Sequence, residues 1–78
     1  MENTKQLTYG EKAVGLSFNP SGDFTVEVIK RQFAEIIDTL NNHRKVADSQ
    51  EVQRMLSVAI TEAQTAQMWA VKAVTWKY

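Results

Sequence analysis

The chain has 78 residues, no cysteine and a formal net charge of zero. This length predicts one domain, 1–78, with a small core and a thin stability margin. Without cysteine, neither disulfides nor a Cys-based zinc site can add stability, so oligomerisation is the remaining common source. The balanced charge argues against binding to duplex nucleic acid. No secretory segment or membrane-length apolar run is visible, so we expect a cytoplasmic protein that binds no membrane.

The first elements expected in chain order are a loose N-terminal segment, 1–7, and a short helix, 8–18. Thr8 and Glu11 have the spacing of a capping box, with Thr8 as the N-cap. Gly10 and Gly15 weaken this helix by roughly 1 kcal/mol each. We therefore expect a short helical arm that depends on packing against the rest of the chain.

A second helix is expected over residues 23–44, after a turn. The segment 19–23, Asn-Pro-Ser-Gly-Asp, is the strongest turn signal in the sequence. Pro20 fixes its own φ, Gly22 permits a positive φ, and Asp23 is a favourable N-cap. The helix carries one apolar stripe at helical spacing, formed by Val26, Ile29, Phe33, Ile36, Ile37 and Leu40.

Residues 49–76 are expected to form a longer helix, which starts at a second capping box between Asp48 and Glu51. Three rows follow it at alternating steps of about four and three, a coiled-coil spacing. The alanine row consists of Val52, Leu56, Ala59, Ala63, Ala66, Ala70 and Ala73. The tryptophan row consists of Met55, Val58, Glu62, Thr65, Trp69, Lys72 and Trp76. The glutamine row consists of Ile60, Gln64, Gln67, Val71 and Val74.

The connection between the two long helices is only a few residues, so they must be antiparallel neighbours. The predicted fold is therefore all-α, an antiparallel helical hairpin with a short N-terminal helix. One long helix can cover only one of the three rows on the other. The uncovered rows predict that the chain self-assembles as a homo-oligomer.

The pattern of polar residues does not favour catalysis. The single histidine, His43, lies near a helix end, where a solvated cation is favourable to the helix dipole. The carboxylates are scattered, without the paired spacing of an acid–base or metal site. Neither a phosphate-binding loop nor a dinucleotide fingerprint is present. We therefore expect no enzyme, no cofactor and no metal.

Two groups of residues are better suited to binding. Phe18 precedes the turn and is the right type to stack on a purine, Ser21 lies within the turn, and Lys30 is available to a phosphate. The alternative is that Phe18 packs as a staple and Lys30 is solvated. Trp69, Lys72 and Trp76 share a helix face, where they either hold a flat anionic ligand or anchor an interface.

Two stretches of the chain resemble a known family. They are YGEKAVGLSFNPSGD over residues 9–23, followed by Val26 and Ile29-Lys30, and AITEAQTAQMWAVKA over residues 59–73. The family comprises the phage and prophage anti-CBASS type 2 sponges, whose hairpin domain is shared with type 1 Thoeris anti-defence proteins. The resemblance implies a homo-hexamer with pockets between protomers. The ligands that the resemblance implies are cyclic oligonucleotides: cyclic dinucleotides such as 3′,3′-cyclic GMP–AMP, with cyclic trinucleotides or cyclic ADP-ribose species as further candidates. These proteins sequester the signal without cleaving it.

The resemblance also implies roles for residues of this chain. Lys30 matches the phosphate-binding lysine, and Phe18 is expected to stack on a base, with Tyr9 as the second candidate for this role. The turn residues Asn19, Pro20 and Ser21 complete this ligand-binding group. Ile60 occupies the position of a basic residue of the trinucleotide pocket, so a second pocket here would need Arg54 or Lys72 from another protomer, with Trp76 as a further candidate.

Two other functions are consistent with the residues. One is a helical protein–protein module, an inhibitor or adaptor, that uses Trp69 and Trp76 as anchors and binds no nucleotide. The other is a small structural phage protein without a ligand.

Overall fold

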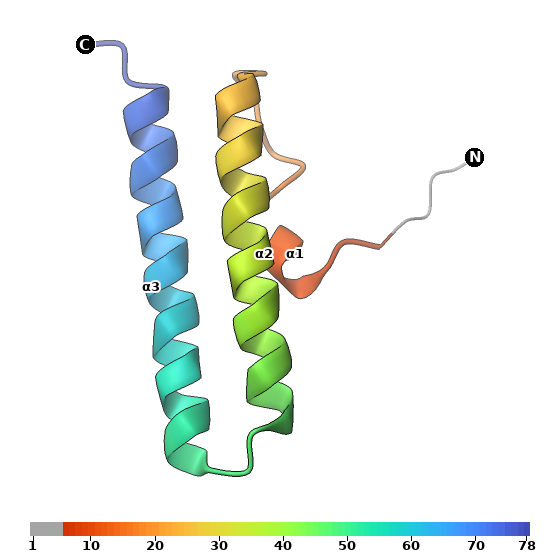
Figure 1. Cartoon of the computed structure of the whole chain (residues 1–78). Helices are drawn as coiled ribbons and strands as arrows, with labels where there is room; N and C mark the ends of the chain where they lie inside the picture. The colour runs from red at the N-terminus through yellow and green to blue at the C-terminus, as the bar shows by residue number, and fades with distance from the viewer. Residues whose placement is uncertain (1–5) are drawn as a thin grey trace.

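A computed structural model describes residues 6–78, and over these residues the chain is helical with no strand. The helices are α1 (Tyr9–Ala13), α2 (Phe24–Val46) and α3 (Gln50–Val74). The two long helices run antiparallel and side by side, and α1 lies against α2 (Figure 1). The predicted all-α hairpin with a short N-terminal helix is confirmed. The loose N-terminal segment falls largely on residues 1–5, which lie outside the described residues.

The short helix is capped as expected but ends early. The Thr8 hydroxyl accepts a hydrogen bond from the Glu11 amide at 3.1 Å, and the Glu11 carboxylate accepts one from the Thr8 amide at 2.9 Å. The predicted span to residue 18 is wrong, because α1 ends at Ala13. Gly15 takes a φ of +64°, a left-handed conformation that a helix cannot continue through.

Gly10 lets α1 approach the backbone of α2 directly. Its amide donates a hydrogen bond to the Asp38 carboxylate at 2.7 Å. A Cβ at this position would lie 2.1 Å from the Ala34 carbonyl oxygen. The absence of a side chain at Gly10 therefore allows α1 to pack closely on α2.

The second helix buries a face that only partly follows the predicted apolar stripe. Asp23 caps α2 as expected, accepting a hydrogen bond from the Thr25 amide at 2.7 Å. The buried residues of α2 are Val26, Lys30, Ala34, Ile37 and Asn41. Ile36, assigned to the stripe, is 51% exposed. The reason is that α1 and α3 pack on two different sides of α2. The buried face of α2 therefore includes Ala34 and leaves out Ile36.

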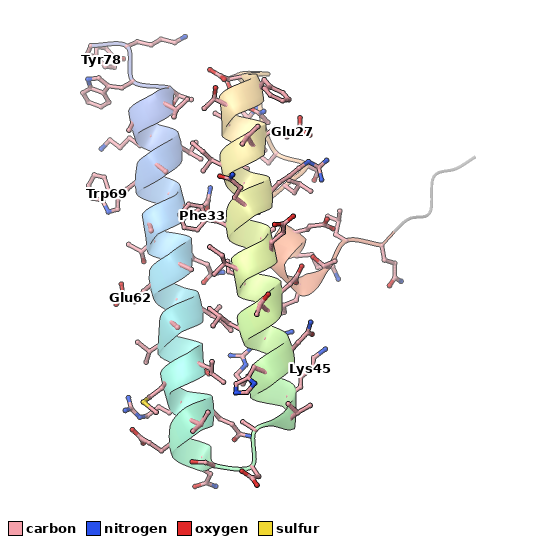
Figure 2. All side chains as sticks on the ribbon, viewed as in Figure 1. Glu27, Phe33, Lys45, Glu62, Trp69 and Tyr78 are labelled. Carbon is pink, nitrogen blue, oxygen red and sulfur yellow. The ribbon has the colours of Figure 1, made fainter. Side chains whose placement is uncertain are left out.

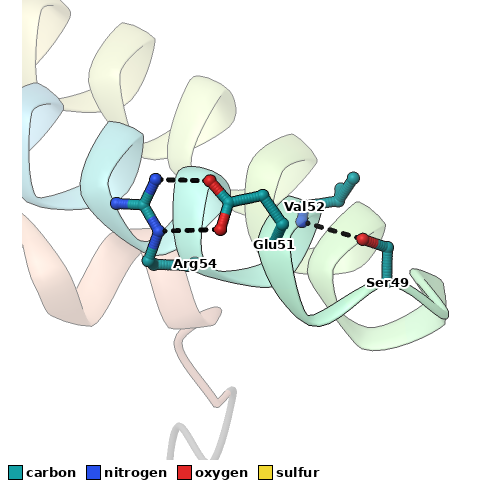
Figure 3. A network of polar contacts seen from close by, with 4 residues as sticks. All are labelled: Ser49, Glu51, Val52 and Arg54. Atoms are coloured by element: carbon teal, nitrogen blue, oxygen red, sulfur yellow. Dashed lines mark hydrogen bonds and ion pairs between the residues drawn. The ribbon is translucent and has the colours of Figure 1, made fainter.

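The start of α3 differs from the prediction by one residue (Figure 3). The N-cap is Ser49, whose hydroxyl accepts a hydrogen bond from the Val52 amide at 3.3 Å. Glu51 does not reach back to Asp48 and instead pairs with Arg54. The expected capping box is therefore wrong. The helix ends at Val74, two residues before the predicted end.

The core lies between all three helices. Its buried apolar residues are Val14, Ala34, Ile37 and Ile60. Figure 2 shows Phe33 between α2 and α3, whereas Glu62 and Trp69 point away from α2. The glutamine row thus packs on α2, with Ile60 and Gln67 buried. The tryptophan row lies on the opposite side of α3, and the alanine row runs along its flank.

Candidate functional site

A hollow of about 240 Å³ opens where the segment before α2 passes the C-terminal end of α3. It is lined by Phe18, Asn19, Pro20, Ser21, Val26, Lys30, Val71 and Thr75. The structure therefore brings together five of the residues that the sequence predicted to bind a ligand: Phe18, Asn19, Pro20, Ser21 and Lys30. Val71 of α3 and Thr75, the C-cap of that helix, were missed because their contribution depends on the closure of the hairpin.

The turn that forms one wall of this hollow is fixed by its own hydrogen bonds. The Gly22 amide donates to the Asn19 carbonyl at 3.1 Å, which closes the turn. The Ser21 hydroxyl donates to the Asn19 side chain at 2.8 Å and accepts from the Asp23 amide at 3.2 Å. Gly22 has a φ of +67°, as its place in the turn predicts. The wall is consequently preorganised.

Three amides around the start of α2 are already used. Those of Gly22 and Asp23 donate within the turn, and that of Thr25 donates to the Asp23 carboxylate. A side-chain cation would therefore be an important contact for an anion in this hollow.

Lys30 supplies that cation, and it does so from a buried position. Only 6% of the residue is exposed, so the expectation of a solvated lysine off the buried stripe is wrong. Its ammonium donates to the Gly15 carbonyl at 3.0 Å and to the Phe18 carbonyl. An ammonium has three donors, so one N–H is left after these two bonds. The backbone thus fixes the charge at the edge of the hollow.

Phe18 is 70% exposed, so it does not pack as a staple. The Lys30 ammonium lies 5.6 Å from the centroid of its ring, within cation–π range. A single residue pair therefore offers a flat apolar face beside a fixed positive charge. Planar bases joined by phosphates require this combination.

A second, shallower hollow of about 640 Å³ lies on the other side of the same pair. Besides Phe18 and Lys30, its lining residues are Lys12, Ala13, Val14, Gly15, Gln64, Gln67 and Met68. Sequence reasoning missed Lys12, Gln64 and Gln67 as site residues. Gln64 and Gln67 could have been identified from the sequence, because they are polar residues in a row that packs on another helix, and such a row is normally apolar.

Tyr9, the second candidate for base stacking, lines neither hollow around Phe18 and Lys30. Arg44, near the opposite end of α2, donates a hydrogen bond to its hydroxyl at 3.4 Å and also bonds Asn41 and Ser57. Along α2, Arg44 is about 21 Å from Lys30. Tyr9 therefore belongs to a cluster that joins α1, α2 and α3 near the closed end of the hairpin.

The residues predicted for a second pocket do not come together within one chain. Arg54 pairs with Glu51 in the first turns of α3, about 27 Å along the helix from Lys72. This hydrogen-bonded pairing lowers the pKa of Glu51 and raises that of Arg54.

Lys72 lies with the two tryptophans near the other end of α3. Its ammonium is 5.2 Å from the ring of Trp69 and 5.5 Å from that of Trp76, with a hollow of about 270 Å³ beside Met68.

The remaining sequence predictions concern metals, membranes and His43. Within residues 6–78, no cluster of His, Asp or Glu side chains is arranged to hold a metal ion. None of the described helices is long and apolar enough to cross a membrane. His43 lies exposed in the last turn of α2, where a positive charge favours the helix dipole.

Comparison with known proteins gives one match. The chain matches the family described as Acb2/Tad1, hairpin domain, over residues 11–75. Neither the curated proteins nor the solved structures contain a match. The matched region includes all three described helices except the first two residues of α1, together with both hollows around Phe18 and Lys30. Because the match spans most of its length, the chain belongs to the Acb2/Tad1 hairpin-domain family.

Proposed function

We propose that this protein sequesters a cyclic di- or trinucleotide immune signal, such as 3′,3′-cyclic GMP–AMP, without cleaving it. By lowering the free concentration of the signal in the cytoplasm of an infected or lysogenic bacterium, it keeps the CBASS effector inactive. Membership of a family of anti-defence sponges supports this role. The observation that carries the proposal is the convergence of Phe18, Lys30 and the turn 19–21 on one hollow.

The chemistry of this hollow matches the parts of such a ligand. The exposed face of Phe18 stacks on a base, a contact worth about 1–3 kcal/mol. The remaining N–H of Lys30 donates to a phosphate oxygen. Because two carbonyls already fix the ammonium, little side-chain entropy is lost when the ligand arrives. Tight binding follows from such a preorganised site.

A second copy of the chain completes the pocket. The hollow of about 240 Å³ is smaller than the roughly 300–1,000 Å³ of typical small-molecule sites. A cyclic dinucleotide has two bases and two phosphates, so two copies related by a two-fold axis would present two Phe18–Lys30 pairs to it. The uncovered rows of α3 provide the surface for assembly, and we propose the homo-hexamer that the family resemblance implies.

Thermal unfolding with a ligand panel tests the proposal. The panel contains cyclic dinucleotides, cyclic trinucleotides and cyclic ADP-ribose isomers. A ligand at 100 times its dissociation constant adds about 2.7 kcal/mol of stability, so we expect a clear rise in Tm for one subset. We expect Phe18→Ala to weaken binding of that subset by about 5- to 150-fold, the equivalent of one lost stacking contact.

Phe24→Ala is the matched control. Phe24 is 75% exposed and only a few residues away, but it does not line the hollow. Its removal should leave ligand binding unchanged. No shift across the whole panel, or equal losses in the two variants, would contradict the proposed pocket and favour a protein partner for the tryptophan row.

A further inference from the structure

The tryptophan row is an uncovered surface of the hairpin. It lies on the side of α3 opposite α2, and its bulky residues are exposed, including Trp69 at 65% and Trp76 at 56%. Within α3 the row keeps the spacing of a coiled-coil seam from Met55 to Lys72, and Trp76 lies just beyond the end of the helix at Val74. A row of this spacing on a free helix face suits a helix as its partner.

The charges of the row identify a second copy of the same row as that partner. Glu62 and Lys72 are its acidic and basic members within the span from Met55 to Trp76. They are about 15 Å apart along α3, too far to pair within one chain. Among the described residues, neither forms an ion pair. A copy related by a two-fold axis would place each beside its opposite.

The spacing of the row makes this antiparallel arrangement consistent along its length. With Lys72 opposite Glu62 of the second copy, Trp69 lies three residues away opposite Thr65. The large indole of Trp69 therefore meets the small side chain of Thr65, as close packing of two helices requires. Val58 then lies opposite the end of the partner α3, beyond which Trp76 follows.

A register shifted by seven residues fits less well. It would place Lys72 opposite Met55 and Glu62 opposite Thr65, and both charges would then be covered without a partner. Leaving a covered charge unpaired is costly. The charge pairing thus selects one register among those that the coiled-coil spacing permits.

The surroundings of Lys72 suit an interface charge. Its ammonium lies 5.2 Å and 5.5 Å from the rings of Trp69 and Trp76, which fix it in place. Exposed ion pairs are weak mainly because solvent screens them and long side chains lose entropy. Two indole rings reduce both losses when a second helix covers the site.

We infer that α3 pairs with α3 of a second copy, antiparallel about a two-fold axis, with Glu62 of each copy bound to Lys72 of the other. This inference rests on the self-assembly proposed above and specifies its surface and register. It makes no use of Phe18 or Lys30, so it can fail while the proposed pocket stands.

A charge swap tests the pairing. We expect Glu62→Lys and Lys72→Glu each to raise the dissociation constant of the assembly at least tenfold, seen as a lower mass by light scattering after size exclusion. The double variant, with both changes, should recover the wild-type mass. Glu35→Lys, the same charge change on the exposed side of α2, is the matched control and should not alter the mass.

Cysteine cross-linking tests the register, because the natural chain has no cysteine. A mixture of Thr65→Cys and Trp69→Cys proteins should oxidise to a mixed disulfide dimer, and neither protein alone should. Unchanged mass in both single charge variants, no recovery in the double variant, or disulfides in the unmixed samples would overturn the inference. The ligand-induced rise in Tm is measured on the same charge variants. It tests ligand binding at the proposed pocket independently of the α3 pairing.

Discussion

Lys30 and Lys72 both lie beside aromatic rings, yet the two regions around them differ in every other respect. Lys30 is buried and held by two backbone carbonyls, with one hollow on either side of it. Lys72 lies exposed on an open helix face between two indoles. We propose that the same cation–aromatic pairing serves two purposes, a ligand site in the hollows at Lys30 and an assembly surface on the open helix face at Lys72.

What separates the two regions is whether the backbone positions the charge. At Lys30 the chain around Gly15 and Phe18 folds back over α2, and its carbonyls fix the ammonium. At Lys72 the ammonium lies beside the rings of Trp69, in α3, and of Trp76, just beyond the end of that helix. A fixed charge in a hollow recognises a small ligand, whereas a row of side chains recognises another helix.

The largest effect is expected from Gly10→Ala, which should disrupt the packing of α1 on α2 that supports the region around Lys30. The new Cβ would lie 2.1 Å from the backbone oxygen of Ala34, so α1 must move off α2. We expect a loss of about 3 kcal/mol in unfolding free energy, at the upper end of overpacking effects. Chemical denaturation measures it. Gly22→Ala, where no atom lies within 4 Å of the added Cβ, should lose only about 1 kcal/mol from its positive φ.

Replacing each lysine by methionine distinguishes the roles of the two regions directly. Lys30→Met leaves two carbonyls without their donor, which should cost about 1–3 kcal/mol and speed amide exchange over residues 14–23. Lys72→Met should leave exchange in that segment unchanged and reduce only the mass of the assembly. Hydrogen-exchange mass spectrometry gives the comparison, and equal exchange in the two variants would contradict it.

The smallest effect concerns the Glu51–Arg54 pair, which lies far from both lysines. Arg54 holds the pKa of Glu51 below its usual value of 4.5. A lowered folded-state pKa contributes stability above pH 4.5 that is lost as the pH falls through the folded value. Glu51→Gln should therefore be slightly less stable than the natural chain at pH 7 and equally stable in strong acid. A difference independent of pH would exclude the ion pair as its source.

Local signals predicted the helices and most of their caps. Thr8 and Asp23 were identified because a cap depends on residues within one turn. The start of α3 was misplaced by one residue because Asp48 and Ser49 are both good N-caps. Four of the residues around the first hollow are contiguous, Phe18 to Ser21, so a motif could reveal them.

The features that sequence reasoning missed depend on contacts between distant segments. Ala34 replaced Ile36 in the core because Gly10 brings α1 onto that side of α2. The burial of Lys30 depends on carbonyls of residues 12 and 15 positions earlier, which local spacing does not show. Gln67 contributes to the site because α3 packs beside α2, which local sequence does not show.

The most direct test of the account is a calorimetric titration of the purified protein with 3′,3′-cyclic GMP–AMP, followed by denaturation and chromatography of the released nucleotide. The account predicts saturable binding, one ligand for every two chains, and full recovery of the intact cyclic nucleotide. Absence of binding to any cyclic oligonucleotide, or recovery of a linear product, would contradict sequestration.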